Sequence, residues 1–177
     1  MHILGKDELF HVHTYRCKHA GSELDEDYIK KAIELGAKAI AFTDHGPFPG
    51  NIFGNRMGIE ELPEYINTLN TLKEKYKKQI KVWVGLEIEY FYSFDHMDDG
   101  ESYYKQLKSM EGLDFLMLGQ HMYEVSPGYY SFSLEKEEIK RLEAPGMGQS
   151  IIAGIATGYF DVVAHPDRTF RRRKVWD

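Results

Sequence analysis

The sequence predicts an α/β protein built on a parallel sheet, and two observations lead to this class. Short apolar segments alternate repeatedly with amphipathic ones along the 177 residues, which gives about five βα units. Each apolar segment also finishes with a histidine or a carboxylate, and a doubly wound sheet or a barrel would bring such strand ends together. No linker, low-complexity tract or repeat interrupts the pattern, so we expect one domain over residues 1–177.

The first half of the chain supplies three of the expected strands. Residues 24–36 place their apolar side chains on one helical face, and Gly36 suits the C-cap of that helix. A second helix shows its charges outward. The expected order in this half is strand 8–14, helix 24–36, strand 37–45, helix 59–78 and strand 81–91.

The second half continues the alternation. Its expected elements are helix 101–110, strand 114–123, a helical region over 135–158 and strand 160–167. Pro145 and Gly146 fall inside the helical region. Because proline lacks an N–H and glycine is a poor helix former, we expect that region to break near them.

The composition limits the classes of function. The 28 acidic residues outnumber the 22 basic ones, which argues against a general nucleic-acid-binding surface. Cys17 is the only cysteine, so there is no disulfide framework and no thiolate zinc knuckle. No secretory segment opens the chain, and no apolar run approaches the roughly 18 residues that a membrane span needs. We therefore expect a cytoplasmic protein with neither membrane nor nucleic acid as a partner.

Histidines gather at the predicted strand ends. In a strand, residues i and i+2 face the same way, so His11 and His13 present two imidazoles side by side. A lone histidine near a strand end is more often structural than a ligand. Six of the eight histidines nevertheless fall within or just after strand ends, which favours a metal site: His11, His13, His19, His45, His121 and His165. Of two glutamates in one alternating strand, either of which could face solvent, Glu87 is preferred over Glu89 as a ligand.

This donor set indicates metal-dependent chemistry. Histidine and carboxylate ligands without a thiolate favour zinc, manganese or iron in a catalytic site. With this many ligands, we expect more than one ion. Clustered divalent metals commonly hydrolyse phosphate esters, because they lower the pKa of a water and hold the phosphoryl oxygens. Phosphoester hydrolysis is therefore the expected reaction.

Five segments carry a resemblance that spans nearly the whole chain. They are FHVHTYRCKHAG, AIAFTDHGPFP, VGLEIEYF, MLGQHMY and FDVVAHPDRTFRR. These segments resemble the successive motifs of the polymerase and histidinol phosphatase (PHP) superfamily. The TDHGPF, QHMYEVSPGYYSF and AHPDR stretches most resemble its histidinol phosphatase branch.

The resemblance implies a distorted (β/α)7 barrel of TIM-like type that holds two to three divalent metals. The implied ligands are His11, His13 and Glu87 for the first metal, Glu87, His121 and His165 for the second, and His19 and His45 for the third. Glu87 would thus bridge two metals and act in catalysis. Arg168 and Arg171 resemble the arginines that clamp the phosphate, a task suited to a guanidinium, and Arg168 would also act in catalysis. A solvated run of charges remains the alternative for Arg171.

The chain departs from the family in one respect. PHP proteins usually end with a further Asp-x-His element that supplies two ligands, and none follows AHPDR here. Five βα units also do not close a barrel of seven strands, and exposed sheet edges are unfavourable. We therefore expect the chain to be an amino-terminal portion of a longer protein. The alternative is that a second copy of the chain supplies the missing ligands and strands by domain swapping. The chain could therefore form a homo-oligomer.

The expected function is a metal-dependent phosphatase that releases phosphate from L-histidinol phosphate in histidine biosynthesis, with a small phosphate ester as its partner. Another PHP phosphoesterase, such as a phosphotyrosine phosphatase or a nuclease that cleaves phosphodiesters, is the alternative within enzymes. A noncatalytic metal-binding domain is the alternative outside them. The acidic net charge counts against a nuclease.

Overall fold

The computed structural model describes residues 5–168, apart from the side chains of residues 137–141, and divides the chain into two compact units. The first unit runs up to Glu87 and includes Glu111–Phe115. The second contains Ile88–Met110 and the chain from Leu116 onward. The single domain expected over 1–177 stays a prediction.

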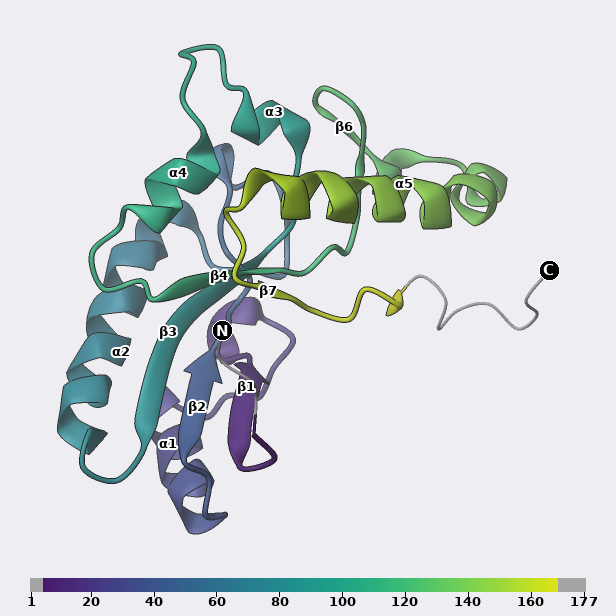
Figure 1. Ribbon diagram of the computed structural model, residues 1–177. Helices are drawn as coiled ribbons and strands as arrows, with labels where there is room; N and C mark the ends of the chain where they lie inside the picture. Colours follow the sequence, from purple (N-terminus) through teal and green to yellow (C-terminus); the bar gives the residue numbers. More distant parts are fainter. Residues whose placement is uncertain (1–4, 169–177) are drawn as a thin grey trace. The chain divides into compact units, whose positions relative to one another are not determined.

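The first unit is a parallel α/β arrangement (Figure 1). Its strands are β1 (Glu8–Val12), β2 (Ala39–Phe42) and β3 (Lys81–Ile88), with parallel pairing of β1 to β2 and of β2 to β3. Its helices are α1 (Asp25–Glu34) and α2 (Leu62–Tyr76), and short 3-10 turns lie at Tyr15–Cys17, Pro49–Asn51 and Ile59–Glu61. Each helix therefore connects two parallel strands, as the alternating pattern predicts.

Apolar side chains from both helices are buried in this unit. Ile29 of α1 and Leu69 of α2 are fully buried, as are Phe42 of β2 and Val84 of β3. The hydroxyl of Tyr65 donates to the carbonyl of Gly85 at 2.8 Å, so this buried polar group is satisfied. The packing fixes the carboxyl ends of β2 and β3, where the histidines and Glu87 stand.

The second unit adds two parallel strands and a hairpin. Its elements are β4 (Phe115–Leu118) and β7 (Val162–Val163), the hairpin strands β5 (Glu124–Ser126) and β6 (Tyr129–Tyr130), a 3-10 turn at Ser131–Ser133, and the helices α3 (Tyr92–Asp95), α4 (Tyr103–Lys108) and α5 (Lys136–Thr157). Within this unit, β4 pairs with β7 in parallel. The predicted α/β class with a parallel sheet is confirmed.

The expected break in the last helix is wrong. α5 continues through Pro145, which lacks one helical N–H. The absence of a side chain at Gly146 serves packing instead, because a Cβ there would stand 2.5 Å from the ring of Tyr123. The hairpin β5–β6 and the short α3 were also not expected, since both lie inside segments without a clear periodicity.

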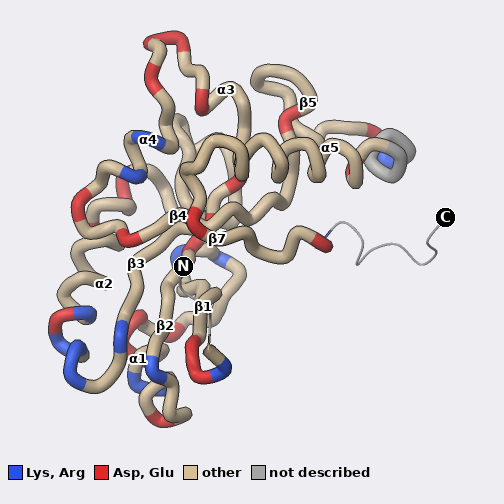
Figure 2. The backbone as a smooth tube through the Cα atoms, in the orientation of Figure 1, with Lys and Arg blue, Asp and Glu red and all other residues tan. Residues whose placement is uncertain are grey.

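Charged residues of both signs lie along the helices of the first unit. Figure 2 shows acidic and basic segments interspersed along α1 and α2, and the lysines at 77, 78 and 81 gather around the turn between α2 and β3. Within residues 5–168, no helix combines the length and the apolar character needed to span a membrane.

Candidate metal centre

The first unit brings five of the predicted ligands together. His11 lies in β1 and His13 directly beyond it, and the register of β1 against β2 shifts between Leu9 and Val12. Such a bulge re-aims side chains at a strand end. The Nε2 atoms of His11 and His13 lie 2.9 Å apart, which confirms that the HxH pair points one way.

Glu87 is the centre of this group. Its carboxylate is buried, and its Oε2 lies 3.1 Å from Nε2 of His11, 3.1 Å from Nε2 of His13 and 3.3 Å from Nδ1 of His45. The backbone holds it beside His45, because the Glu87 N–H donates to the Asp44 carbonyl at 3.0 Å and the Gly46 N–H donates to the Glu87 carbonyl at 2.8 Å. A buried carboxylate surrounded by imidazoles requires cationic or hydrogen-bonding partners.

His19 completes the group from the loop that follows the 3-10 turn Tyr15–Cys17. Its Nε2 lies 3.2 Å from Nε2 of His45. Four imidazoles and one carboxylate therefore converge within one unit, with nitrogen atoms close enough to one another to share an ion. This donor set fits zinc, manganese or iron, as expected from the residue types.

Asp44 does not belong to the ligands, although it stands at a strand end. It is fully buried and accepts three hydrogen bonds: from the Thr14 N–H at 2.7 Å, the Thr14 hydroxyl at 2.8 Å and the Cys17 thiol at 2.9 Å. With three donors on its two oxygens, the carboxylate ties the segment after β1 to the end of β2. Its role is to hold the histidines on either side.

The second unit holds the remaining predicted ligands. The rings of His121 and His165 lie edge to face with centroids 5.1 Å apart. Nδ1 of His121 donates to Oε1 of Glu89 at 3.0 Å, and this hydrogen bond fixes the orientation of the ring. His165 takes a backbone conformation with φ of 29°, rare for a residue with a side chain.

Glu89 is a functional candidate that sequence reasoning passed over in favour of Glu87. The sequence left open that one of the two glutamates faces solvent, but Glu87 and Glu89 are both fully buried. The hydroxyl of Tyr104 donates to the Glu89 carbonyl at 3.0 Å and accepts the Phe91 N–H at 2.7 Å, which fixes the backbone at this point. The i, i+2 spacing of the two carboxylates was the available signal.

Arg168 lies in the turn after β7, where its N–H donates to the carbonyl of His165 at 2.9 Å. Its proposed contact with phosphate stays a prediction. Arg171 lies outside the described residues. The expected bridge from Glu87 to a metal held by His121 and His165 joins residues of different units and also stays a prediction.

A cavity of about 400 Å³ opens in the second unit. Its walls include Tyr90, Tyr92, Tyr123 and Glu124, with residues of α5 such as Gln149 opposite. Two backbone N–H groups, from Ser93 and Gly128, donate to the Glu124 carboxylate at 3.0 and 3.1 Å. Aromatic faces beside a carboxylate suit an organic cation.

Comparison with known proteins identifies the family of the chain. The model of the PHP domain matches residues 10–177. The chain belongs to the PHP domain family. A histidinol-phosphatase of Bacillus subtilis (strain 168) is 30% identical over 91 residues, which is 48% of this chain and 34% of that protein. A probable histidinol-phosphatase of Deinococcus radiodurans is 26% identical over 165 residues, which is 89% of this chain and 59% of the relative.

A solved structure shares the fold of the chain. A histidinol phosphate phosphatase of Lactococcus lactis, complexed with zinc, L-histidinol and phosphate, matches with a TM-score of 0.65 and 22% identity. The match covers 93% of this chain and 59% of that chain. The chain thus has an incomplete form of the TIM-like PHP fold, as expected, and spans from about a third to three fifths of the length of the relatives named here.

Proposed function

We propose that the protein to which this PHP chain belongs is a metal-dependent phosphomonoesterase, with L-histidinol phosphate as its substrate in histidine biosynthesis. The observation that carries the proposal is the convergence of His11, His13 and His45 on the buried carboxylate of Glu87. The names of the Bacillus and Deinococcus relatives support the choice of substrate. The expected setting is the cytoplasm.

The side chains of the first unit would hold one metal through His11, His13 and Glu87 and another through His19 and His45. In the second unit, His121 and His165 would contribute to a further site. Divalent metals at such positions supply charge that stabilises phosphoryl oxygens and lowers the pKa of a water.

The protein's own groups would orient the ester and its proton transfers. Glu89 holds the His121 ring in one tautomer, and Arg168 would clamp the phosphate through its guanidinium. The cavity beside Tyr92 and Glu124 would receive the organic part of the substrate, since histidinol carries an ammonium group.

The test is phosphate release from L-histidinol phosphate. It compares this chain with the protein obtained when its gene is read to the natural stop codon, each supplied with manganese or zinc. We expect turnover by the longer protein that His13→Ala and Glu87→Ala each reduce by at least about 100-fold, because each removes a proposed ligand. Glu34→Ala is the matched control, since Glu34 is an exposed carboxylate of α1 that pairs with Lys31 away from the ligand group. Turnover unaffected by His13→Ala would reject the proposal.

A second candidate is a phosphatase for another ester. One relative, from Shewanella piezotolerans, is 27% identical over 158 residues and is named only a probable phosphatase. A panel of phosphomonoesters with one phosphodiester separates the two candidates. Release from other monoesters but not from L-histidinol phosphate would favour the second. Cleavage of the phosphodiester alone would instead indicate a nuclease.

A further inference from the structure

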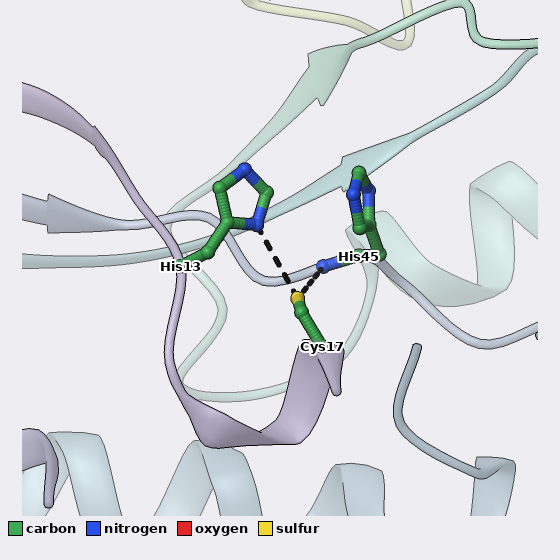
Figure 3. A group of neighbouring side chains, drawn as sticks. All are labelled: His13, Cys17 and His45. Atoms are coloured by element: carbon green, nitrogen blue, oxygen red, sulfur yellow. Dashed lines mark hydrogen bonds between the residues drawn. The ribbon is translucent and has the colours of Figure 1, made fainter. Parts of the chain in front are cut away.

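The single cysteine lies inside the histidine group of the first unit. Cys17 is fully buried at the end of the 3-10 turn Tyr15–Cys17, and Figure 3 shows its sulfur between His13 and the backbone of His45. Its Sγ is 3.3 Å from Nδ1 of His13, 3.0 Å from the backbone N of His45 and 2.9 Å from Oδ1 of Asp44. Three polar contacts at a buried thiol indicate a defined role.

The direction of these hydrogen bonds follows from the groups themselves. The Asp44 carboxylate only accepts, so the thiol must donate its one hydrogen to Asp44. The His45 N–H donates to the sulfur. Because the thiol hydrogen is already used, the sulfur can only accept from the ring of His13. With a metal at Nε2 in place of the Glu87 contact, the one ring proton of His13 would sit on Nδ1 and be donated to this sulfur.

That tautomer is the one that metal binding at Nε2 requires. Nε2 is the atom of His13 that faces Glu87 at 3.1 Å and His11 at 2.9 Å. A metal-ligating histidine normally donates its other ring N–H to a carboxylate or carbonyl, which fixes the ring orientation and raises the basicity of the ligand nitrogen. His121 donates directly to Glu89 in this way. His13 is instead linked to the Asp44 carboxylate through the sulfur of Cys17.

Cys17 could instead be a ligand, since ligand atoms of His13, Cys17 and His45 lie within 4.8 Å of one another. Two facts oppose this assignment. A thiol that binds a metal loses its proton, so the hydrogen bond from Cys17 to Asp44 would be lost. A thiolate would also place a second negative charge 2.9 Å from the Asp44 carboxylate.

We propose that Cys17 is a positioning residue for His13: it accepts the Nδ1–H of the ring and donates to Asp44, so that a thiol links the histidine to its orienting carboxylate. The proposal rests on the proposed function only for the claim that His13 is a ligand. The hydrogen-bond chain itself can be tested without turnover.

The first test is the ring protonation of His13 in the zinc-loaded protein, measured by long-range ¹⁵N–¹H correlation spectra and assigned by the signal that His13→Gln removes. We expect an Nδ1–H ring whose proton exchanges slowly with water in the wild type and in Cys17→Ser, whose hydroxyl can make the same two hydrogen bonds. In Cys17→Ala, that proton should exchange faster, because it has lost its acceptor. A wild-type ring that carries its proton on Nε2 would overturn the proposal without any variant.

The second test is zinc affinity, measured by competition with a chromophoric chelator. We expect Cys17→Ala to weaken zinc binding by about 10- to 100-fold, which is the usual loss when an outer partner of a ligand is removed, and Cys17→Ser to restore most of it. Val82→Ala is the matched control, because Val82 is a buried residue of β3 in the same unit, five residues before Glu87. An equal loss in Val82→Ala would show general loosening and would overturn the proposal.

Cobalt substitution separates the positioning role from direct ligation. A cobalt-loaded wild type should lack the intense near-ultraviolet band of a sulfur–cobalt bond. A band that disappears in Cys17→Ser would make Cys17 a ligand and overturn the proposal. These outcomes do not depend on the proposed activity. Absence of phosphate release would reject the activity, while the His13 ring would still carry its proton on Nδ1.

Discussion

Thr14 donates two hydrogen bonds to Asp44, from its backbone N–H at 2.7 Å and from its hydroxyl at 2.8 Å. Both residues are fully buried. Thr14 directly follows His13 and Asp44 directly precedes His45, so this pair of bonds joins two backbone positions that carry proposed ligands. The separation of the two histidines is therefore set by a pair of residues that bind no metal.

Thr14→Val should destabilise the protein, because it keeps the side-chain shape but removes the hydroxyl from a buried carboxylate. We expect a loss of about 1–3 kcal/mol in the free energy of unfolding, measured by urea denaturation. Thr68→Val is the matched control, since the Thr68 hydroxyl donates to Glu64 on an exposed face of α2, and it should cost no more than about 0.5 kcal/mol. Equal losses would contradict the role given to Asp44.

Arg16→Met should be more damaging. The guanidinium of Arg16 donates to both oxygens of Asp25, at 2.7 and 2.9 Å, and the two side chains are only 2% and 5% exposed. Removing one partner of a buried ion pair costs about 3–5 kcal/mol, because the other charge is left uncompensated. Lys31→Met, which breaks the exposed pair with Glu34, should cost at most about 1 kcal/mol in the same assay. A small loss for Arg16→Met would show that Asp25 finds other partners.

Gly85→Ala tests the packing of β3, two residues before Glu87. A Cβ at this position would lie 2.4 Å from the ring of Phe115, so the ring must shift. We expect a loss of about 1–3 kcal/mol, in line with overpacked cores, and partial recovery in a double variant with Phe115→Leu. Gly54→Ala meets no atom within 4 Å and is the matched control. If Gly85→Ala and Gly54→Ala unfold at the same urea concentration, the close approach of Phe115 to Gly85 does not limit the stability of the protein.

The fall in the free energy of unfolding at acidic pH should depend on Glu26. Hydrogen bonds from Lys75 and the Tyr76 hydroxyl lower the pKa of Glu26 from 4.5 to about 2. A depressed carboxyl pKa stabilises the fold above pH 4.5, and this contribution is lost as the pH falls toward 2. Between these values, Glu26→Gln should show a shallower fall in the free energy of unfolding than the wild type, and Tyr76→Phe an intermediate one. An unchanged slope in Glu26→Gln would contradict this assignment.

Local patterns in the sequence predicted the alternating parallel strands and helices, and they singled out the histidines that the first unit brings together. The helical periodicity of residues 24–36 and the i, i+2 spacing of His11 and His13 are properties of neighbouring residues, so they can be read without the fold. The roles of Asp44 and Glu89 could not, because a carboxylate acts as ligand or as support according to the donors that distant residues bring to it. Pro145 failed as a helix breaker for the same reason, since packing outweighed local preference.

Metal binding should raise the stability of the chain. A ligand that binds only the folded state at 100 times its dissociation constant adds about 2.7 kcal/mol, which corresponds to about 5–10 °C in the thermal midpoint for a chain of this size. We expect zinc to produce such a rise in the wild type and in Glu34→Ala, and chelation to reverse it. In His13→Ala the rise should be largely lost, because one proposed ligand beside Glu87 is missing. Equal rises in all three proteins, measured by circular dichroism at 222 nm, would place the bound zinc elsewhere.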